Sequence, residues 1–187
     1  MSTAAVEIPG YLAGTWAVDP VHSEVSFVVR HMMVSKVRGR FDKFEGSFVT
    51  AENIEESTVT ASVDLSSINT GQEQRDAHIR SADFFEVEKH PHMTFASTGV
   101  RVDGGDFLLD GDLTIRGTTK PVTFKLEASG FGPDAYGGTR IGFSAETQIG
   151  RSDFGVNFNG PIPGVPGGVV VSEKVIITLE IEGVLQA

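Results

Sequence analysis

The sequence predicts an all-β protein, an eight-stranded antiparallel barrel with one short helical segment. Most apolar runs alternate with polar residues at a period of two, which is typical of strands that bury one face. The runs follow one another in hairpin order, interrupted by residues 66–92. A two-layer sandwich is the alternative. Several strands are longer than eight residues, and we favour the barrel because closure removes long exposed edges.

The first strand is expected at about residues 23–30, within the stretch WAVDPVHSEVSFVVRH. Val25, Phe27 and Val29 share its inward face, because successive side chains of a strand point to opposite sides. His31 is in phase with them and would also point inward. A buried histidine more often satisfies a local hydrogen bond than it catalyses a reaction, although it can also bind a ligand oxygen.

The remaining strands repeat this pattern up to the C-terminus. The non-alternating stretch His31–Lys36 predicts a helical turn or a kink, and Asp42-Lys43 predicts a tight hairpin. Residues 150–168 contain GPIPGVPGG and are expected to form a long loop. We count about eight strands in all, and the runs after the first lie at about residues 37–41 and 44–50, both short, and at 58–65, 93–101, 107–115, 122–128, 141–149 and 169–185.

Residues 66–92 are expected to form one or two short helices. Thr70 precedes an acidic turn and is a candidate N-cap. This segment also holds a polar cluster, in which Asp76 would lie beside Arg80 at a helical spacing of four. The cluster is either a polar collar over one barrel mouth that holds a ligand head group, or a solvated helix face with an ordinary ion pair. Its members are Arg75, Asp76, His78 and Arg80.

The composition argues against several classes of function. The net charge of −10 opposes binding to nucleic acid and to anionic lipid surfaces, because such binding normally relies on lysine and arginine. No cysteine is present, which excludes a disulfide, a thiolate metal site and a cysteine nucleophile. His90-Pro91-His92, with His78 upstream, has a metal-like spacing, but a zinc site needs three or four ligands with carboxylate support. We interpret these histidines as surface or loop residues and expect neither a metal nor a cofactor.

We expect a single domain over residues 1–187, with residues 1–14 as a loosely ordered arm. Those first residues lack the basic and apolar regions of a signal peptide, and we expect a cytoplasmic protein. No run approaches the ~18 apolar residues of a membrane span, so no stable insertion into a bilayer is expected.

Aromatic usage is unusual, with 13 Phe against one Trp and two Tyr. Phenylalanine has no polar group to satisfy, so it suits a dry interior. An eight-stranded barrel is just wide enough to be filled by side chains or to hold one slender ligand. The sequence therefore leaves two structures open, a packed core and a lined lipid cavity.

Five motifs occur in order and together resemble the YceI-like family of polyisoprenoid-binding proteins. They are WAVDPVHSEVSFVVRH, VRGRFDKFEGSF, TGQEQRDAHIRSADFFEVEKHPHMTF, GDLTIRGTTKPVTF and RSDFG. The resemblance implies a lipocalin-like extended barrel with a helical segment beside it, and a long isoprenoid or related amphiphilic chain held inside. It also implies a homodimer. Many members carry a secretory leader, which the start of this sequence does not show. The ligand of this chain could therefore differ from theirs.

The favoured hypothesis is a lipid-binding protein without catalysis, which sequesters or carries a long-chain isoprenoid of the quinone or polyprenyl type. Fatty acids or fatty acyl amides are the alternative ligands. A second hypothesis is a small-barrel enzyme with His31 or His78 as acid–base catalyst, although the sequence contains no GxSxG elbow and no P-loop. A third is a filled barrel without a ligand. The candidate ligand-binding residues are Phe27, Val29, His31, Phe84, Phe95, Phe124, Ile141, Phe143 and Ile177, with Arg75, Asp76, His78 and Arg80 around the head group.

Overall fold

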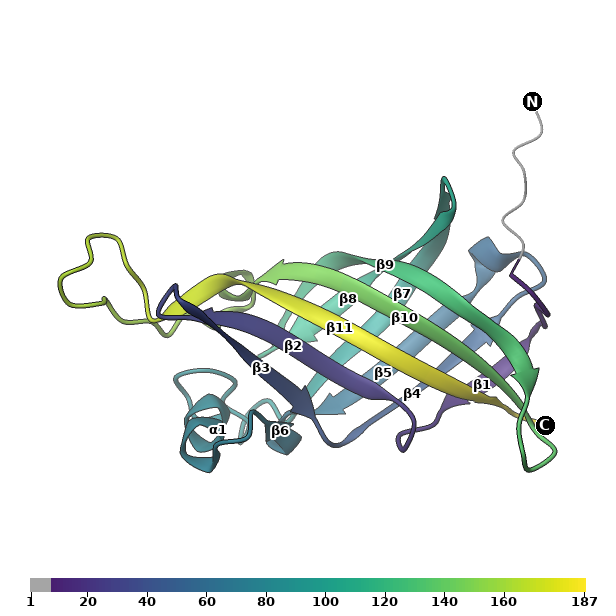
Figure 1. Ribbon diagram of the computed structural model, residues 1–187, viewed down its shortest axis with the longest axis horizontal. Helices are drawn as coiled ribbons and strands as arrows, with labels where there is room; N and C mark the ends of the chain where they lie inside the picture. The colour runs from purple at the N-terminus through teal and green to yellow at the C-terminus, as the bar shows by residue number, and fades with distance from the viewer. Residues whose placement is uncertain (1–7) are drawn as a thin grey trace.

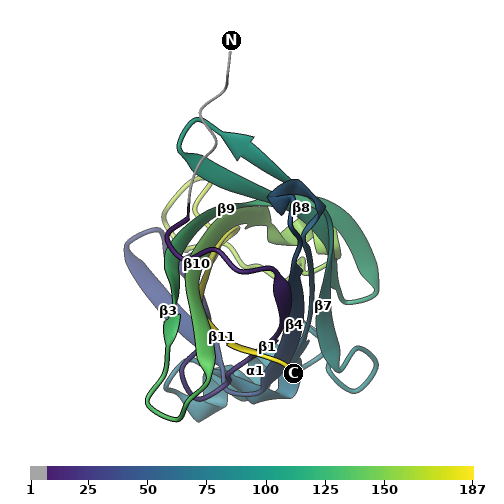
Figure 2. The same cartoon turned by 90° about the vertical axis from the view of Figure 1, so that its right-hand side faces the viewer.

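The sheet closes into a tube because its first and last strands pair with each other (Figures 1 and 2). The computed structural model describes residues 8–187. Eight antiparallel strands follow the order β1-β4-β5-β7-β8-β9-β10-β11, and β11 returns to β1, which confirms the predicted barrel. The strands are β1 (Gly14–Val18), β2 (Glu24–His31), β3 (Ser35–Phe41), β4 (Phe44–Thr50), β5 (Thr58–Asp64), β6 (Ile68–Asn69), β7 (His92–Asp103), β8 (Asp106–Ile115), β9 (Thr118–Pro133), β10 (Thr139–Gly150) and β11 (Val171–Leu185).

At one end, β2 and β3 extend the wall beyond this closed ring. One edge of β11 pairs with β10, while its other edge pairs with β1 near Leu185 and with β2 nearer its start. The pairs β1–β2 and β3–β4 therefore each behave as one long strand with a break in the middle. β3 pairs with β6 at two residues, Arg40 and Phe41, and within residues 8–187 β6 has no further strand partner. The wall is therefore open beyond β6.

The predicted hairpin at Asp42-Lys43 is wrong. β3 pairs with β2 and β6, whereas β4 pairs with β1 and β5, so the chain runs on in one direction through a break. Two hydrogen bonds to a distant segment hold the chain in this path. Asp42 N donates to Ser67 O at 3.1 Å, and Lys43 N donates to Ser67 Oγ at 2.9 Å. Neither residue has the positive φ that a two-residue hairpin requires.

The hairpin of this region lies at Met32-Met33, where the sequence predicts a helical turn or a kink. Val34 N donates to His31 O at 3.1 Å, and φ is 52° at Met32 and 61° at Met33. This is the geometry of a type I′ turn, which favours Asn-Gly. Each non-glycine residue held in this left-handed conformation is unfavourable by about 1–2 kcal/mol.

The helix α1 (Glu73–Arg80) lies beside the open end of the barrel (Figure 1), and mainly turns follow it over residues 81–91. The predicted N-cap at Thr70 is wrong, because the side chain of Gln72 caps the helix by accepting from Arg75 N. Thr70 N donates instead to Asp76 Oδ1 at 3.0 Å. Across residues 8–187, no helix is long and apolar enough to cross a bilayer.

Glycines allow three phenylalanine rings to lie over the backbone of the barrel wall. A Cβ atom would lie 2.3 Å from Phe27 Cζ at Gly39, 2.3 Å from Phe95 Cζ at Gly111 and 2.5 Å from Phe48 Cζ at Gly183. Each ring thus covers a glycine on another strand, as in the aromatic rescue of glycine known in β-sheets. These rings bury apolar area against the wall and leave more of the lumen free than rings that point to its axis.

The end of the barrel away from α1 is packed with side chains. Trp16 is fully buried, stacks on Phe48 at 6.1 Å between ring centroids, and donates from Nε1 to Thr50 Oγ1 at 2.8 Å. Ile141 and Phe143 belong to the same cluster. An entrance for a ligand is therefore expected at the α1 end.

An ion-pair cluster ties the β1–β2 connection to the β9–β10 hairpin. Arg140 Nη1 lies 2.7 Å from Asp19 Oδ2, and Arg140 Nε lies 2.9 Å from Asp134 Oδ2. Hydrogen bonds from His22 and Arg140 hold the pKa of Asp19 well below its usual range. The folded state therefore favours the ionised form of this carboxyl group.

Asp19→Asn is expected to lower the free energy of unfolding at about pH 7 by about 1.5–3 kcal/mol, the range for hydrogen bonds to charged groups. Because folding depresses the pKa of Asp19, its contribution is fully present above the unfolded pKa of about 3.9 and is lost as the pH falls further. Urea unfolding of both proteins at about pH 7 and about pH 3 measures this. The difference between them should shrink at the lower pH, and an equal difference at both values would contradict the assignment.

Candidate functional site

A cavity of about 670 Å³ opens at the α1 end of the barrel. Residues of β2, β3 and β11 form one side, and residues of α1, residues 84–85 and the segment 149–158 form the other. A smaller space of about 90 Å³ continues toward the packed end past Val25 and Ile177, which line both. Ligand pockets in proteins typically measure roughly 300–1,000 Å³. The lumen is therefore hollow near α1 and nearly filled beyond it.

Most of the wall of this cavity is apolar. Phe27, Val29 and Ile177 line it from the strands, and Phe84 lines it from the segment after α1. His31, at the end of β2, also lines the cavity. The strand phase thus predicts that Phe27, Val29 and His31 line the cavity, but not Arg30, which also lines it.

Every ionisable side chain that lines the cavity within the described residues is basic. The chain as a whole has 25 acidic and 15 Lys or Arg residues, so this arrangement does not follow from composition. An apolar lumen with a basic rim favours an amphiphile whose polar end accepts hydrogen bonds or carries negative charge. The basic residues are Arg30, His31, Arg75, His78 and Arg151.

Arg151 is the most deeply buried of these residues, with 6% of its surface exposed. It donates to four backbone carbonyl groups, from Nε to Ser172 O at 2.9 Å, from Nη1 to Val156 O at 2.9 Å and Phe158 O at 2.8 Å, and from Nη2 to Val171 O at 3.4 Å. Burial lowers its pKa, and the Glu173 carboxylate opposes this effect. Arg151 is not among the residues predicted from the sequence, although the RSDFG motif has an arginine where an alternating strand ends and a glycine-rich loop begins.

Arg75 and His78 lie on α1 at the rim of the cavity. Arg75 donates from Nε to Thr70 Oγ1 at 2.7 Å and from Nη2 to Thr70 O at 2.8 Å, which holds the guanidinium against the loop before the helix. His78 Nε2 lies 2.8 Å from Asp83 Oδ2. The imidazole also contacts the ring of Phe84 edge-on, at 5.1 Å between centroids. This contact joins α1 to the segment after it, and both line the cavity.

Asp76 and Arg80 do not line the cavity. Asp76 is 4% exposed and accepts hydrogen bonds from Thr70. Arg80 Nη2 lies 2.7 Å from Glu73 Oε1. The predicted ion pair between Asp76 and Arg80 is wrong, because each side chain has a different partner. Both residues stabilise α1 and its connection, so any effect on a ligand would be indirect.

Four further candidate residues lie deeper in the barrel. Phe95, Phe124 and Phe143 line the smaller space, and the first two rings meet edge-on at 5.4 Å. Ile141 belongs to the cluster around Trp16 at the packed end. None of the four lines the main cavity. Ligand binding by any of the candidate residues stays a prediction.

One group of side chains within residues 8–187 has donor atoms close enough together for a metal ion. Asp19, His22 and Glu182 each offer an atom within 4.8 Å of the others. Arg140 Nη1 already lies 2.7 Å from Asp19 Oδ2 and 3.5 Å from Glu182 Oε1. A metal ion would compete with this guanidinium for the same carboxylates. The ion pairs with Arg140 therefore explain why these three side chains lie close together.

A family model described as the YceI-like domain matches residues 16–183. The chain belongs to the YceI-like family. The matched range contains the barrel strands almost in full, together with α1 and Arg151. The resemblance drawn from the five motifs is thereby confirmed, and the cavity described above lies within the YceI-like domain.

Three relatives of this YceI-like chain are informative. The chain is 38% identical over 167 residues to protein YceI from Escherichia coli, which covers 88% of this chain and 83% of that protein. The crystal structure of BcnA from Burkholderia cenocepacia has a TM-score of 0.76 at 23% identity, covering 88% of this chain and 98% of BcnA. A polyisoprenoid binding domain from Saccharophagus degradans, implicated in plant cell wall breakdown, has a TM-score of 0.67 at 20% identity, covering 91% and 98%. The two structures support the YceI-like fold.

Proposed function

We propose that this YceI-like protein binds a long-chain isoprenoid lipid, of the quinone or polyprenyl type, and sequesters or carries it. The observation that carries the proposal is an apolar cavity of about 670 Å³ in a barrel whose other end is packed. A lipid chain in this cavity gains about 0.8 kcal/mol for each buried methylene, before the entropic cost of binding. The Saccharophagus degradans relative, a polyisoprenoid binding domain, supports this class of ligand.

The basic rim favours a head group that carries negative charge. Arg30 and Arg75 line the cavity, and hydrogen bonds from a guanidinium to an anion are roughly twice as strong as those between neutral groups. Arg151 adds positive charge, while its donors bind backbone carbonyl groups. A polyprenyl phosphate matches both parts of the site, because its prenyl chain is apolar like the wall and its phosphate is complementary to the basic rim. A quinone carbonyl accepts hydrogen bonds without a charge, and the alternative fatty acid offers a carboxylate. We expect phosphate or carboxylate ligands to bind more tightly than the amide or alcohol of the same chain.

Native mass spectrometry of the protein purified from its host tests the proposal. We expect a co-purified lipid of isoprenoid mass and, after removal of that lipid, uptake of geranylgeranyl phosphate in preference to geranylgeraniol. Palmitate in the same assay separates the fatty acid alternative. Recovery of no lipid, together with no uptake of any prenyl chain, would contradict the proposal.

Catalysis on a hydrophobic substrate is a second candidate function, favoured by one observation. His78 lines the cavity and has Asp83 within hydrogen-bond distance, which is how a general base is oriented. Turnover of a prenyl phosphate that disappears in His78→Ala or His31→Ala would support an enzyme. Tight binding without turnover would support a binding protein, which we favour.

Sedimentation equilibrium of the same samples tests the homodimer that the family resemblance implies.

A further inference from the structure

Two uncharged, apolar loops meet at the open end of the barrel (Figure 1). They are the β2–β3 turn, Met32–Val34, and residues 154–172, which contain no charged side chain. Met32 N donates to Val170 O at 2.8 Å, which joins the two loops. Val34 is 82% exposed and Met33 57% exposed. We call these two loops the apolar tip.

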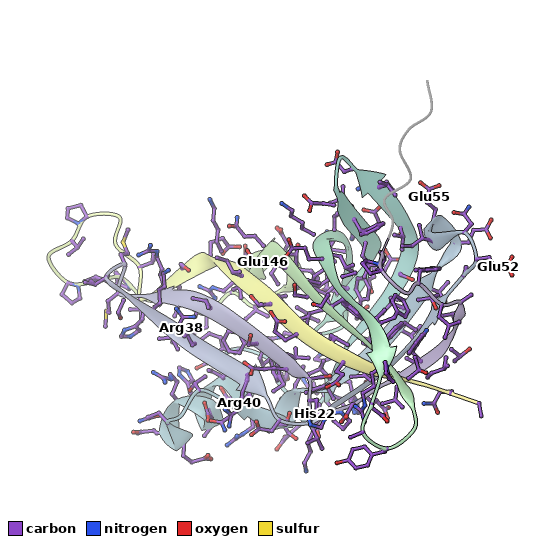
Figure 3. The ribbon with its side chains drawn as sticks, turned by 45° about the vertical axis from the view of Figure 1, so that its right-hand side comes forward. His22, Arg38, Arg40, Glu52, Glu55 and Glu146 are labelled. Atoms are coloured by element: carbon purple, nitrogen blue, oxygen red, sulfur yellow. The ribbon has the colours of Figure 1, made fainter. Side chains whose placement is uncertain are left out.

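After Glu24, the first residue of β2, every Asp, Glu, Lys or Arg in the two strands that lead into the apolar tip is basic. Residues 25–41 carry Arg30, Lys36, Arg38 and Arg40 and no acidic residue. Among the residues that the structure describes, Arg40 alone of these four has an ion pair, with Asp42 at 2.9 Å. Figure 3 shows Arg38 and Arg40 on β3, at the opposite side of the molecule from Glu52 and Glu55. β3 is therefore basic next to the apolar tip, whereas Asp153 and Glu173 flank the second loop of the tip.

This local charge matters more to a surface at the tip than the net charge of −10. At physiological ionic strength, charges are screened over about 8 Å. The 15 residues of β11 span about 50 Å, so acidic groups at the far end contribute little at the apolar tip. Asp153 and Glu173, which flank the second loop, are the carboxylates next to the tip in the sequence. The net charge of the whole chain therefore does not exclude contact between this end of the molecule and an anionic lipid surface.

The residues of the β2–β3 turn are not those that its backbone favours. A type I′ turn favours Asn-Gly, yet Met32 and Met33 occupy the two positions of positive φ. Their side chains are 40% and 57% exposed, so the turn does not gain compensation by packing them into the core. Exposed apolar residues in an unfavourable backbone conformation indicate a role outside folding.

We propose that the apolar tip docks on an anionic lipid bilayer. Met32, Met33 and Val34 would enter the interface, and Lys36 and Arg38 would face the lipid head groups. The turn begins directly after the last cavity residue of β2, and Val170 and Val171 from the second loop also line the cavity, so docking brings the cavity mouth to the lipid. Exchange of cargo with the bilayer rests on the proposed function, whereas attachment to the bilayer does not.

Co-sedimentation of the full-length protein with vesicles measures the docking. The vesicles contain phosphatidylcholine, with or without phosphatidylglycerol. We expect binding to the mixed vesicles, weaker binding to phosphatidylcholine alone, and a decline with added salt. Lys36→Gln and Arg38→Gln are each expected to weaken binding to the mixed vesicles about fivefold.

Met32→Asn combined with Met33→Gly removes two apolar side chains and supplies the pair that the turn favours, so this variant is expected to fold at least as well. Its binding to mixed vesicles should fall at least about tenfold, because the two side chains no longer leave water. Val21→Asn is the matched control, since Val21 is 83% exposed but lies in the β1–β2 connection. This control should bind like the wild type.

The proposal is overturned if the wild type sediments with no vesicles, or if the turn variant and the Val21 control lose binding equally. It is also overturned if the wild type is a dimer that the turn variant dissociates, because a second copy then covers the tip. Uptake of geranylgeranyl phosphate from solution measures binding in the cavity independently of vesicles. The turn variant should take up as much of it as the wild type. If the protein takes up geranylgeranyl phosphate but does not bind vesicles, only the docking proposal is contradicted. If it binds vesicles but takes up no geranylgeranyl phosphate, only the proposed function is contradicted.

Discussion

Replacing Arg151 with methionine is expected to lower the free energy of unfolding by about 3–5 kcal/mol. The guanidinium donates to the carbonyl groups of Ser172, Val156 and Phe158 and is 6% exposed. Methionine has a similar length but no donor, so these carbonyl groups lose their partner at about 1–3 kcal/mol for each that stays buried. Urea unfolding, followed by the fluorescence of the buried Trp16, measures the loss.

The same substitution is expected to release the loop that Arg151 holds. The carbonyl partners come from both ends of residues 156–172, so one side chain closes this loop against β11. Limited proteolysis should cut the variant within the loop faster than the wild type. Arg151→Lys keeps the charge but supplies fewer donors, and we expect an intermediate loss. A loss below about 1 kcal/mol in the methionine variant would show that water satisfies the carbonyl groups instead.

The strands and their inward faces could be predicted because both depend on neighbouring residues. Alternation of apolar and polar residues placed Phe27 and Val29 on the inner face of β2, where they line the cavity. The turn at Asp42-Lys43 was predicted wrongly because a distant residue, Ser67, decides the path of the chain there. Met32-Met33 contains no residue type that favours a type I′ turn, so local sequence does not reveal that hairpin.

The cavity itself could not be predicted, because it depends on pairings between distant segments. The wall opens where β3 meets β6 at Arg40 and Phe41, because no further strand of the described part of the chain follows. Whether a phenylalanine lines or fills the lumen depends on the residue across the strand pair, and Phe27 lies opposite Gly39 only in the register that the folded sheet adopts. Arg151 was missed because a single arginine after a strand forms no pattern.

Gly39→Val is expected to weaken the binding of a prenyl chain in the main cavity at least about tenfold. A Cβ atom at position 39 would lie 2.3 Å from Phe27 Cζ and 2.6 Å from Phe27 Cε1. The β3 backbone is held by its pairing with β2, so the ring is the part that moves. Because Phe27 lines the cavity, the displaced ring enters the space that the lipid would occupy.

Gly111→Val is the matched control for this experiment. It displaces the ring of Phe95, which lines the smaller space and not the main cavity. Both variants are expected to lose about 1–3 kcal/mol of stability through overpacking, and the control at least as much, because its Cβ would also lie 2.8 Å from Ala96 O. Binding of geranylgeranyl phosphate should fall in the Gly39 variant and persist in the Gly111 variant. A loss of affinity that follows stability in both would argue against a specific block.

Adding Phe27→Ala to Gly39→Val completes the test, because it removes the displaced ring while valine covers the wall. This double variant is expected to recover most of the affinity that Gly39→Val loses. Wild-type affinity in the single variant would mean that the lipid does not lie along β2 and β3, where the proposed site has its apolar side. Recovery in the double variant would show that a glycine opposite a phenylalanine keeps the lumen vacant, and would explain how a chain with 13 Phe leaves room for a ligand.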